Sequence, residues 1–297
     1  MKVTYKANAK INLSLDILSR LENGYHSLFM IMQSVDLFDF VTVEKTASDG
    51  IVLTGSEKDI PYDERNTAYK AAKAFFEENG IDDRDVHIHI VKKIPFAAGL
   101  AGGSADAAAV IAALNDIYRT SLSLKEMCRI GVKVGADVPF CLTGGTCAAQ
   151  NIGEVISSLP ELKDCFIVLA KPEEGVSTGE AYRQFDSHSV RHLDNPAMLY
   201  AAANGDFDAI CENTGNVFEQ LIEVPDRVPI KKVMYDCGAK CACMSGSGPT
   251  VFGVFEDEKS ASEALKALKE KYKDSKSASV YICKPASSGL VRTQWER

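Results

Sequence analysis

The sequence predicts an α+β protein built from two domains. Its 297 residues exceed one average domain of about 150 residues, so two domains are expected. Apolar residues recur at two-residue spacing in some segments and at helical spacing in others, which indicates both strands and helices. The two kinds of segment do not alternate regularly, as they would in a doubly wound parallel sheet, and this favours the α+β class.

The first half of the chain mixes strands and helices. Polar and apolar residues alternate along the first two predicted strands, which a turn at 22–24 separates. The first helix carries alanines and phenylalanines at helical spacing and ends at Gly80. The second helix is rich in alanine, which has the highest helix propensity, and follows a glycine-rich loop. In chain order the predicted elements are strands at 3–18 and 34–46, a helix at 66–79, a strand at 86–91, and helices at 105–118 and 123–134.

The second half repeats this mixture of elements. Short apolar runs predict strands, and apolar residues on one helical face predict helices. The segment 144–160 is the predicted boundary, which gives an N-terminal domain of residues 1–155 and a C-terminal domain of residues 156–297. The predicted elements are a strand at 165–170, helices at 195–204 and 212–223, a strand at 250–255, a helix at 260–272 and a strand at 278–283.

Composition and charge restrict the class of protein. Hydrophobic residues make up 46% and charged residues 25% of the chain, which excludes a mostly disordered protein. The net charge of −8 argues against a general nucleic-acid binder, which needs a basic surface, but allows a local site for a small anion. The longest apolar run, 107–114, is far shorter than the ~20 residues that span a bilayer, so no membrane partner is expected.

Nine cysteines, an odd number, occur in the chain, and no signal-peptide-like apolar run follows Met1. We therefore expect free thiols in a reducing cytoplasm. Cys237, Cys241 and Cys243 cluster in the sequence, but they form no Cys-x-x-Cys pair and have no fourth ligand nearby. A buried structural role is favoured over zinc, and no protein metal site is expected.

The strongest functional signal is the glycine-rich segment 95–107, PFAAGLAGGSADA, between a predicted strand and a predicted helix. Glycines allow backbone N–H groups to surround an anion, and a helix N-terminus adds free donors and a positive dipole end. The segment predicts a phosphate-binding loop; the alternative is a tight turn with a helix capped by Ser104 or Asp106. It is not a Walker A loop, because no Gly-Lys-Ser/Thr follows it.

Three further segments indicate a function only when they are considered together. Asp137 lies among small and apolar residues in 135–140, GADVPF, where a turn or cap is the simpler interpretation. The segment 244–249, MSGSGP, is either a turn or a second backbone surface near a ligand. Lys10 lies in the first predicted strand, where a solvated lysine is the simpler interpretation.

Taken together, these four segments resemble the GHMP kinase superfamily, which includes galactokinases, homoserine kinases and mevalonate kinases. The segments 9–13, AKINL, 23–26, NGYH, and 135–139, GADVP, are similar to one family within it, which phosphorylates a cytidine diphosphate-linked methylerythritol. The resemblance covers about residues 5–285, with departures at Asn8 and Ala101 that remove no functional side chain. It implies an N-terminal α/β domain related to a ribosomal-protein fold and a C-terminal ferredoxin-like domain.

The resemblance also assigns roles at the acceptor end of the site. Lys10 and Asp137 would be the catalytic pair that flanks the acceptor hydroxyl, and Asn12 would hold them or the substrate. The remaining substrate-binding residues are expected around the cytidine: Tyr25 and His26, with His26 at the cytosine edge, and Thr178 with Tyr182, which would stack on the base.

At the donor end the resemblance implies that ATP and Mg²⁺ bind as cofactors. The expected ATP contacts are the adenosine contacts Asn66 and Lys92 and the phosphate-loop residues Pro95, Gly99, Leu100, Ala101, Gly102, Gly103 and Ser104. No set of carboxylates dedicated to Mg²⁺ is visible in the sequence.

The implied activity is ATP-dependent phosphorylation of the 2-hydroxyl of the cytidyl-linked methylerythritol, in the non-mevalonate route to isoprenoid precursors. A kinase for another small alcohol, such as homoserine or mevalonate, is the nearest alternative, but the segment Gly24–Tyr25–His26 argues against a substrate without a base. A catalytically silent nucleotide-binding regulator is the second alternative, and the presence of both Lys10 and Asp137 argues against it.

Overall fold

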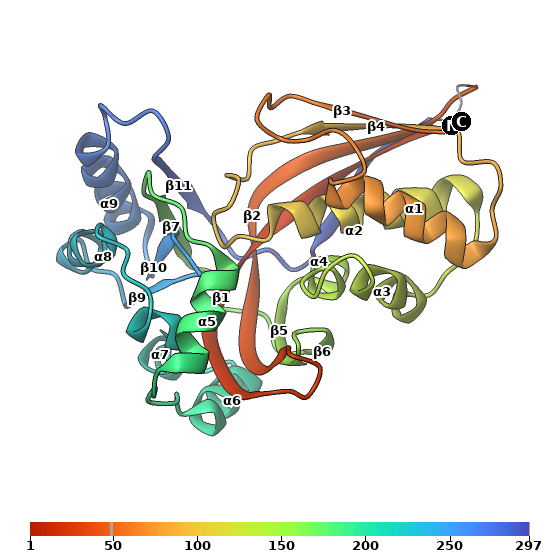
Figure 1. Ribbon diagram of the computed structural model, residues 1–297. Helices are drawn as coiled ribbons and strands as arrows, with labels where there is room; N and C mark the ends of the chain where they lie inside the picture. Colours follow the sequence, from red (N-terminus) through yellow and green to blue (C-terminus); the bar gives the residue numbers. More distant parts are fainter. Residues whose placement is uncertain (48–49, 297) are drawn as a thin grey trace.

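The computed structural model describes residues 1–47 and 50–296, which form two lobes joined by a long pair of strands (Figure 1). The pair consists of β1 (Lys2–Arg20) and β2 (His26–Lys45), which run antiparallel along nearly their whole length. Residues 7–17 of β1 and 28–35 of β2 are buried without interruption, so both faces of the pair are covered along its middle. The pair crosses the middle of the molecule and belongs to the larger sheet.

The larger sheet has the path β12-β1-β2-β4-β3, and three short strands pair outside this path. β5 pairs with β2 and β6, and β8 runs parallel to β1. The C-terminal β12 returns to the first strand of the chain and pairs with it. The bounds are β3 (Ile51–Gly55), β4 (Val86–Val91), β5 (Thr146–Asn151), β6 (Val155–Ser158), β8 (Gly215–Asn216) and β12 (Leu290–Glu296).

The helices that accompany this sheet in the N-terminal lobe are α1 (Thr67–Asn79), α2 (Gly102–Tyr118), α3 (Leu124–Val132) and α4 (Val138–Thr143). α2 is the central one, since nearly all of its residues after the first turn are buried. Alanine dominates it because small side chains allow close packing against α1, β1 and β2. Asn66 caps α1, and Gly80 ends it in the left-handed conformation at φ 61°.

The second sheet is antiparallel, with the order β11-β7-β10-β9, and α8 and α9 pack on it. Ile230 and Met234 of α8 and Leu268 of α9 are buried in the small core that they share with β7 and β10. α5, α6 and α7 lie around the far end of the β1–β2 pair (Figure 1). The bounds are β7 (Phe166–Lys171), α5 (Thr178–Ser187), α6 (Asn195–Asn204), α7 (Phe207–Glu212), the 3-10 turn η1 (Val217–Gln220), α8 (Arg227–Asp236), β9 (Cys241–Met244), β10 (Val251–Phe255), α9 (Glu258–Lys271) and β11 (Ser279–Cys283).

The predicted α+β class is confirmed, and the helix predicted over 212–223 is wrong. That segment begins at the end of α7, passes through the short strand β8 and the turn η1, and ends in irregular structure. The Asn216 side chain accepts a hydrogen bond from the Phe218 N–H, which replaces a helical bond with a local turn. α2 begins at Gly102, three residues before the predicted start, so the last glycines of the loop are helical.

The division at residues 155 and 156 stays a prediction. β6 begins at Val155 and pairs with β5, and both β8 and β12 lie in the larger sheet although they come late in the chain.

Seven of the nine cysteines are buried and all nine are free thiols. Within 1–47 and 50–296, no helix is long and apolar enough to cross a membrane.

Candidate active site

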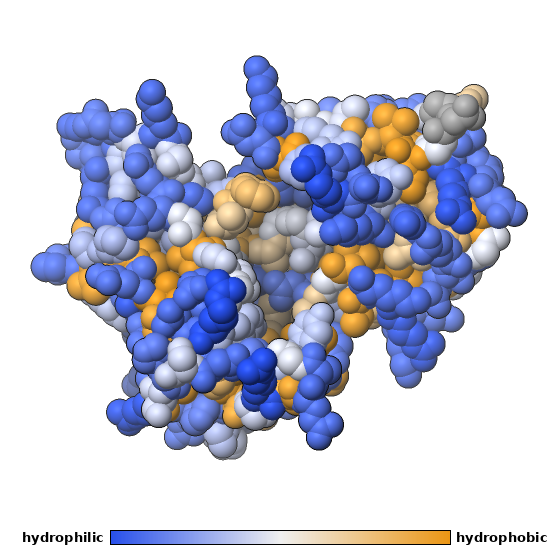
Figure 2. Space-filling model, viewed as in Figure 1, coloured by the Kyte–Doolittle hydropathy of each residue, from blue (hydrophilic) through white to orange (hydrophobic). Residues whose placement is uncertain are grey.

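A cavity of about 780 Å³ lies in the cleft between the two lobes. Figure 2 shows this hollow near the middle of the molecule, bordered by both hydrophilic and hydrophobic residues. Its lining comes from β1, β2, the glycine-rich loop, α2, the start of α4, α5 and the loop before β10. Segments that are distant in the sequence therefore meet around one space.

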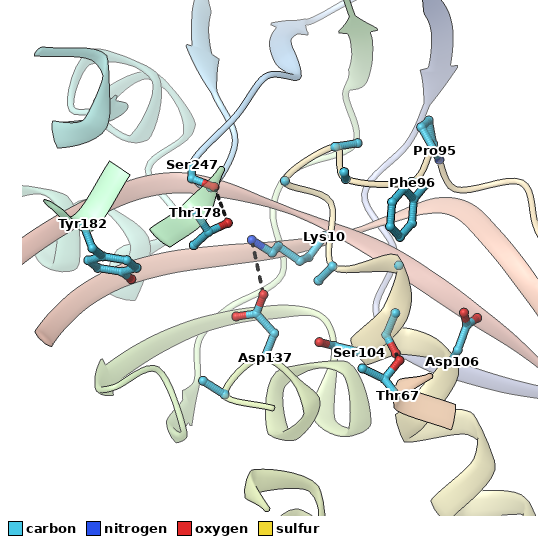
Figure 3. Close-up of a pocket in the computed structure, with 18 of the residues that line it drawn as sticks. Lys10, Thr67, Pro95, Phe96, Ser104, Asp106, Asp137, Thr178, Tyr182 and Ser247 are labelled. Atoms are coloured by element: carbon cyan, nitrogen blue, oxygen red, sulfur yellow. Dashed lines mark hydrogen bonds and ion pairs between the residues drawn. The ribbon is translucent and has the colours of Figure 1, made fainter. Parts of the chain in front are cut away.

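Lys10 and Asp137 face each other at the centre of this cavity (Figure 3). The Lys10 ammonium is 3.7 Å from Oδ2 of Asp137 and donates a 2.7 Å hydrogen bond to Oδ1 of Asn12. Lys10 is only 4% exposed, whereas the Asp137 side chain is 32% exposed. A buried ammonium needs such partners, so the alternative of a solvated surface lysine is excluded.

Asp137 is the residue immediately before α4, yet its carboxylate makes no capping hydrogen bond. Its oxygens therefore remain directed into the cavity beside the Lys10 ammonium (Figure 3). Asn12 positions this pair, because its Oδ1 also accepts a 2.9 Å bond from the Gly246 N–H. One amide thus connects the first strand, the ion pair and the loop before β10.

The backbone of the glycine-rich loop has the conformation of an anion-binding turn. Ala97, Gly99 and Ala101 have φ values of 50°, 74° and 57°, so every second residue is left-handed. Alternation of this kind turns successive N–H groups toward one side. α2 then starts at Gly102, and no side chain caps it. The alternative of a helix capped by Ser104 or Asp106 is therefore excluded, and the donors at the helix start stay available to a ligand.

A second loop, 245–248, supports the first. Ser245 donates a 2.9 Å hydrogen bond to the Gly99 carbonyl, and a Cβ on Gly99 would lie 2.2 Å from the Ser245 carbonyl oxygen. Only glycine fits there, both for this contact and for its positive φ. Asn216 fixes the second loop by donating 2.7 Å bonds to the carbonyls of Met244 and Gly246.

Lys92 lies below the phosphate loop in a buried cluster with two carboxylates. Its ammonium is 2.5 Å from Asp39 and 2.7 Å from Asp106, and Asp39 also accepts the backbone N–H groups of Lys93 and Ile94. Burial lowers the pKa of Lys92, but the charges of Asp106 and Asp39 outweigh burial and raise it overall. The Lys92 charge is therefore engaged by protein, although its side chain lines the cavity.

Asp106 is the less satisfied member of this cluster. Its Oδ1 is buried and has no hydrogen-bond partner. Burial raises its pKa to about 7, and the neighbouring Asp39 charge adds to this effect while Lys92 opposes it. One ammonium thus serves two carboxylates beneath the first turns of α2.

Asn66 and Thr67 border the same end of the cavity. Both ends of the Asn66 amide are used by the protein, since Oδ1 accepts the Ala68 N–H and Nδ2 donates to the Pro61 carbonyl. Thr67 donates a 2.7 Å bond to the Gly103 carbonyl, which ties α1 to the start of α2.

The opposite end of the cavity is aromatic. Tyr25 is 61% exposed, while His26 is buried and stacks on Tyr182 with ring centroids 4.7 Å apart and an interplanar angle of 20°. Thr178 and Ser247 share a 2.9 Å hydroxyl contact (Figure 3). Burial, with the Asp137 charge second, raises the pKa of Tyr182 to about 12, so its hydroxyl stays protonated.

The structure brings together every residue that the sequence analysis singled out for the site except Asn12 and Leu100, which support the cavity from behind its lining. Sequence reasoning missed Asp39 and Asn216, and it singled out the segments that contain Phe96 and Ser247 without giving these two side chains a role. A buried aspartate between the phenylalanines of β2 was a usable signal, because an isolated charge in a strand core needs a partner. The sequence offered no such signal for Asn216, because the segment around it was predicted to be a helix.

Comparison with known proteins supports one family. Residues 66–145 match the GHMP kinases N terminal domain, and residues 198–274 match the GHMP kinases C terminal model. The chain is 43% identical over 286 residues to the 4-diphosphocytidyl-2-C-methyl-D-erythritol kinase of Clostridium perfringens, covering 95% of this chain and 98% of that protein.

Two solved structures resemble the whole chain. A crystal structure of 4-(cytidine 5'-diphospho)-2C-methyl-D-erythritol kinase has a TM-score of 0.76 at 30% identity and covers 95% of this chain and 99% of its own. Homoserine kinase from Cytophaga hutchinsonii has a TM-score of 0.79 at 19% identity, covers 98% of this chain and 97% of its own, and supports the fold alone. The chain therefore belongs to the GHMP kinases and, within them, to the family of 4-diphosphocytidyl-2-C-methyl-D-erythritol kinases.

Proposed function

We propose that this protein transfers the terminal phosphoryl group of ATP to the 2-hydroxyl of 4-diphosphocytidyl-2-C-methyl-D-erythritol. The observation that carries the proposal is the order of groups along one cavity: an aromatic end, the Lys10–Asp137 pair and the phosphate loop (Figure 3). A nucleotide-linked alcohol and ATP would thus approach the ion pair from opposite sides. The many free thiols also suit a reducing cytoplasm.

Asp137 is proposed to accept the proton of the attacking hydroxyl. Its carboxylate is partly exposed and makes no capping bond, so it can take a hydroxyl within hydrogen-bond reach. The Lys10 ammonium lies beside this carboxylate and stabilises charge as it develops, and Asn12 fixes the ammonium. Positioning and charge stabilisation are the main contributions that phosphoryl transfer requires from a protein.

The phosphate loop is proposed to hold the ATP phosphates through backbone N–H groups from Gly99 to Ser104. The alternating left-handed residues and the uncapped start of α2 support this role. Among residues 1–47 and 50–296, no three His, Cys, Asp or Glu side chains converge as a metal site. Mg²⁺ bound with ATP would be held mainly by phosphate oxygens, beside the Ser104 hydroxyl that lines the cavity, and would neutralise phosphate charge.

The aromatic end is proposed to hold the cytidine. A base that hydrogen-bonds the His26 edge lies in the imidazole plane, and the 20° angle makes that plane nearly parallel to the Tyr182 ring. Edge contact and stacking are therefore compatible in one pose. Tyr25 and Thr178 also line this end. At the other end, Asn66 and Lys92 are proposed to border the adenosine, mainly by shaping the wall, since their polar atoms already have protein partners.

ADP release measured with a panel of acceptors tests the proposal. We expect turnover with the cytidyl methylerythritol and little with homoserine, mevalonate or galactose. Preference for one of the small alcohols would support the alternative GHMP kinase, and ATP binding without ADP release for any acceptor would support the silent regulator. Mass spectrometry of the product then checks that a single phosphoryl group was added.

A further inference from the structure

Three side chains of α5 enclose the imidazole of His26. Tyr182 stacks on it, and Phe185 meets it edge-on with ring centroids 5.7 Å apart at 88°. Asp186 places Oδ1 2.8 Å from Nε2 of His26. The ring is therefore held in position and in plane, while the residue still lines the cavity.

The partner of His26 is itself held in place. Oδ2 of Asp186 lies 3.3 Å from the Arg20 guanidinium, and Arg20 is the residue opposite His26 in the β1–β2 register. The hydrogen bond from His26, together with the nearby charge of Arg20, lowers the pKa of Asp186 below its ordinary value. Asp186 is thus an ionised carboxylate, which can only accept hydrogen bonds.

This contact decides where the imidazole carries its proton. Because Asp186 accepts, Nε2 of His26 must donate, and in the neutral ring Nδ1 is then an acceptor. None of the described residues forms a hydrogen bond with Nδ1 of His26, and this nitrogen is not fully buried. An acceptor therefore remains available on a ring that borders the cavity.

We infer that Asp186 is a positioning residue that makes His26 select cytosine over uracil. The inference rests on the proposed function, because it assumes that the aromatic end holds a pyrimidine. Cytosine presents an amino donor at position 4, which suits an acceptor, whereas uracil presents a carbonyl acceptor there, which Nδ1 repels. Asp186 acts through His26 and has no direct contact with the base.

The test compares binding of cytidine diphosphate and uridine diphosphate by calorimetric titration, with a non-hydrolysable ATP analogue saturating the donor site. The parent protein is expected to bind the cytidine compound at least ~10-fold more tightly, since a mismatched edge leaves buried polar groups unpaired. In Asp186→Asn the amide can present either oxygen or nitrogen to Nε2, so the preference should fall to within about threefold.

Glu180→Gln is the matched control, because it removes a carboxylate from the same helix whose partner is Arg183 rather than His26. It should keep the parent preference, and both variants should keep the parent affinity for the ATP analogue. A folded Asp186→Asn protein with an unchanged preference overturns the inference, as does a parent protein that binds both diphosphates equally.

Nitrogen-15 NMR of the histidine rings in the parent protein provides a readout that does not depend on any variant. The inference predicts that His26 carries its proton on Nε2, and a proton on Nδ1 overturns it even if Asp186→Asn fails to fold. Phosphoryl transfer to the cytidyl substrate tests the proposed function separately. A parent protein that selects cytidine diphosphate but transfers no phosphoryl group would refute that function and leave the role of Asp186 standing.

Discussion

Replacing Asp106 by asparagine should stabilise the protein, and the gain should grow with pH. Asp106 shares the Lys92 ammonium with Asp39, and its buried Oδ1 has no partner. Its pKa is raised from 3.8 to about 7, chiefly by burial. Between pH 3.8 and about pH 7 the folded protein still binds a proton at Asp106, whereas the unfolded chain has already released it. The free energy of unfolding therefore falls as the pH rises through this window.

The magnitude follows from the two pKa values. The difference between 3.8 and about 7 corresponds to about 4 kcal/mol at 1.36 kcal/mol per pKa unit, and linkage assigns about 3 kcal/mol of this to the interval from about pH 5 to about pH 8. Asparagine has nearly the same shape and does not titrate. The difference in unfolding free energy between Asp106→Asn and the parent should therefore increase by a few kcal/mol across that interval.

Urea unfolding followed by circular dichroism at several pH values between these limits measures this difference. Asp83→Asn is the control, because Asp83 is exposed and the Lys45 ammonium lowers its pKa, so it titrates below the interval. Its difference from the parent should stay constant. A constant or decreasing difference for Asp106→Asn would refute the assignment of Asp106 as an unsatisfied buried carboxyl group.

Three further substitutions test other parts of the site. Gly99→Ala should lower the melting temperature and impair binding of both substrates, because its Cβ would lie 2.2 Å from the Ser245 carbonyl oxygen. Gly103→Val lies at a helical position where a Cβ would be 3.1 Å from Oγ1 of Thr67, and it should weaken binding of ATP more than of the cytidyl substrate in calorimetric titration. Asn216→Ala should reduce the free energy of unfolding in urea by about 2–4 kcal/mol, since it leaves the buried carbonyls of Met244 and Gly246 without donors. Tyr182→Ala should raise KM for the cytidyl substrate through a stacking loss of about 1–3 kcal/mol, with KM for ATP unchanged, and Tyr182→Phe should be mild. Equal effects on both substrates in Gly103→Val or Tyr182→Ala would instead indicate a purely structural role.

Local patterns were sufficient for β1, β4 and α1, but not for residues 26–33 of β2 or for α5. The alternation in β1 and β4 and the spacing in α1 depend on neighbours in the sequence, so the sequence alone predicts them. The pairing of Lys10 with Asp137 joins residues far apart in the chain, and the family resemblance rather than periodicity indicated it.

Features that depend on distant contacts were not predictable. The start of α2 at Gly102 has no capping side chain and follows a left-handed alanine, so neither capping nor propensity rules mark it. The cluster of Lys92 with Asp39 and Asp106 forms only when β2, β4 and α2 assemble. Asp186 reaches His26 across 160 positions of sequence, and no local pattern reveals such a pair.

The most direct test of the account is the kinetics of Asp137→Asn, because the central claim is that this carboxylate accepts the proton of the substrate hydroxyl. An amide is a poor base, so kcat should fall by about 10²–10⁴-fold. The affinity for ATP should stay close to that of the parent, since the phosphate loop is untouched. Asp63→Asn, which removes an exposed carboxylate paired with Arg65, is the control and should keep parent turnover. Turnover of Asp137→Asn within roughly threefold of the parent, far less than removal of a general base causes, would contradict the account.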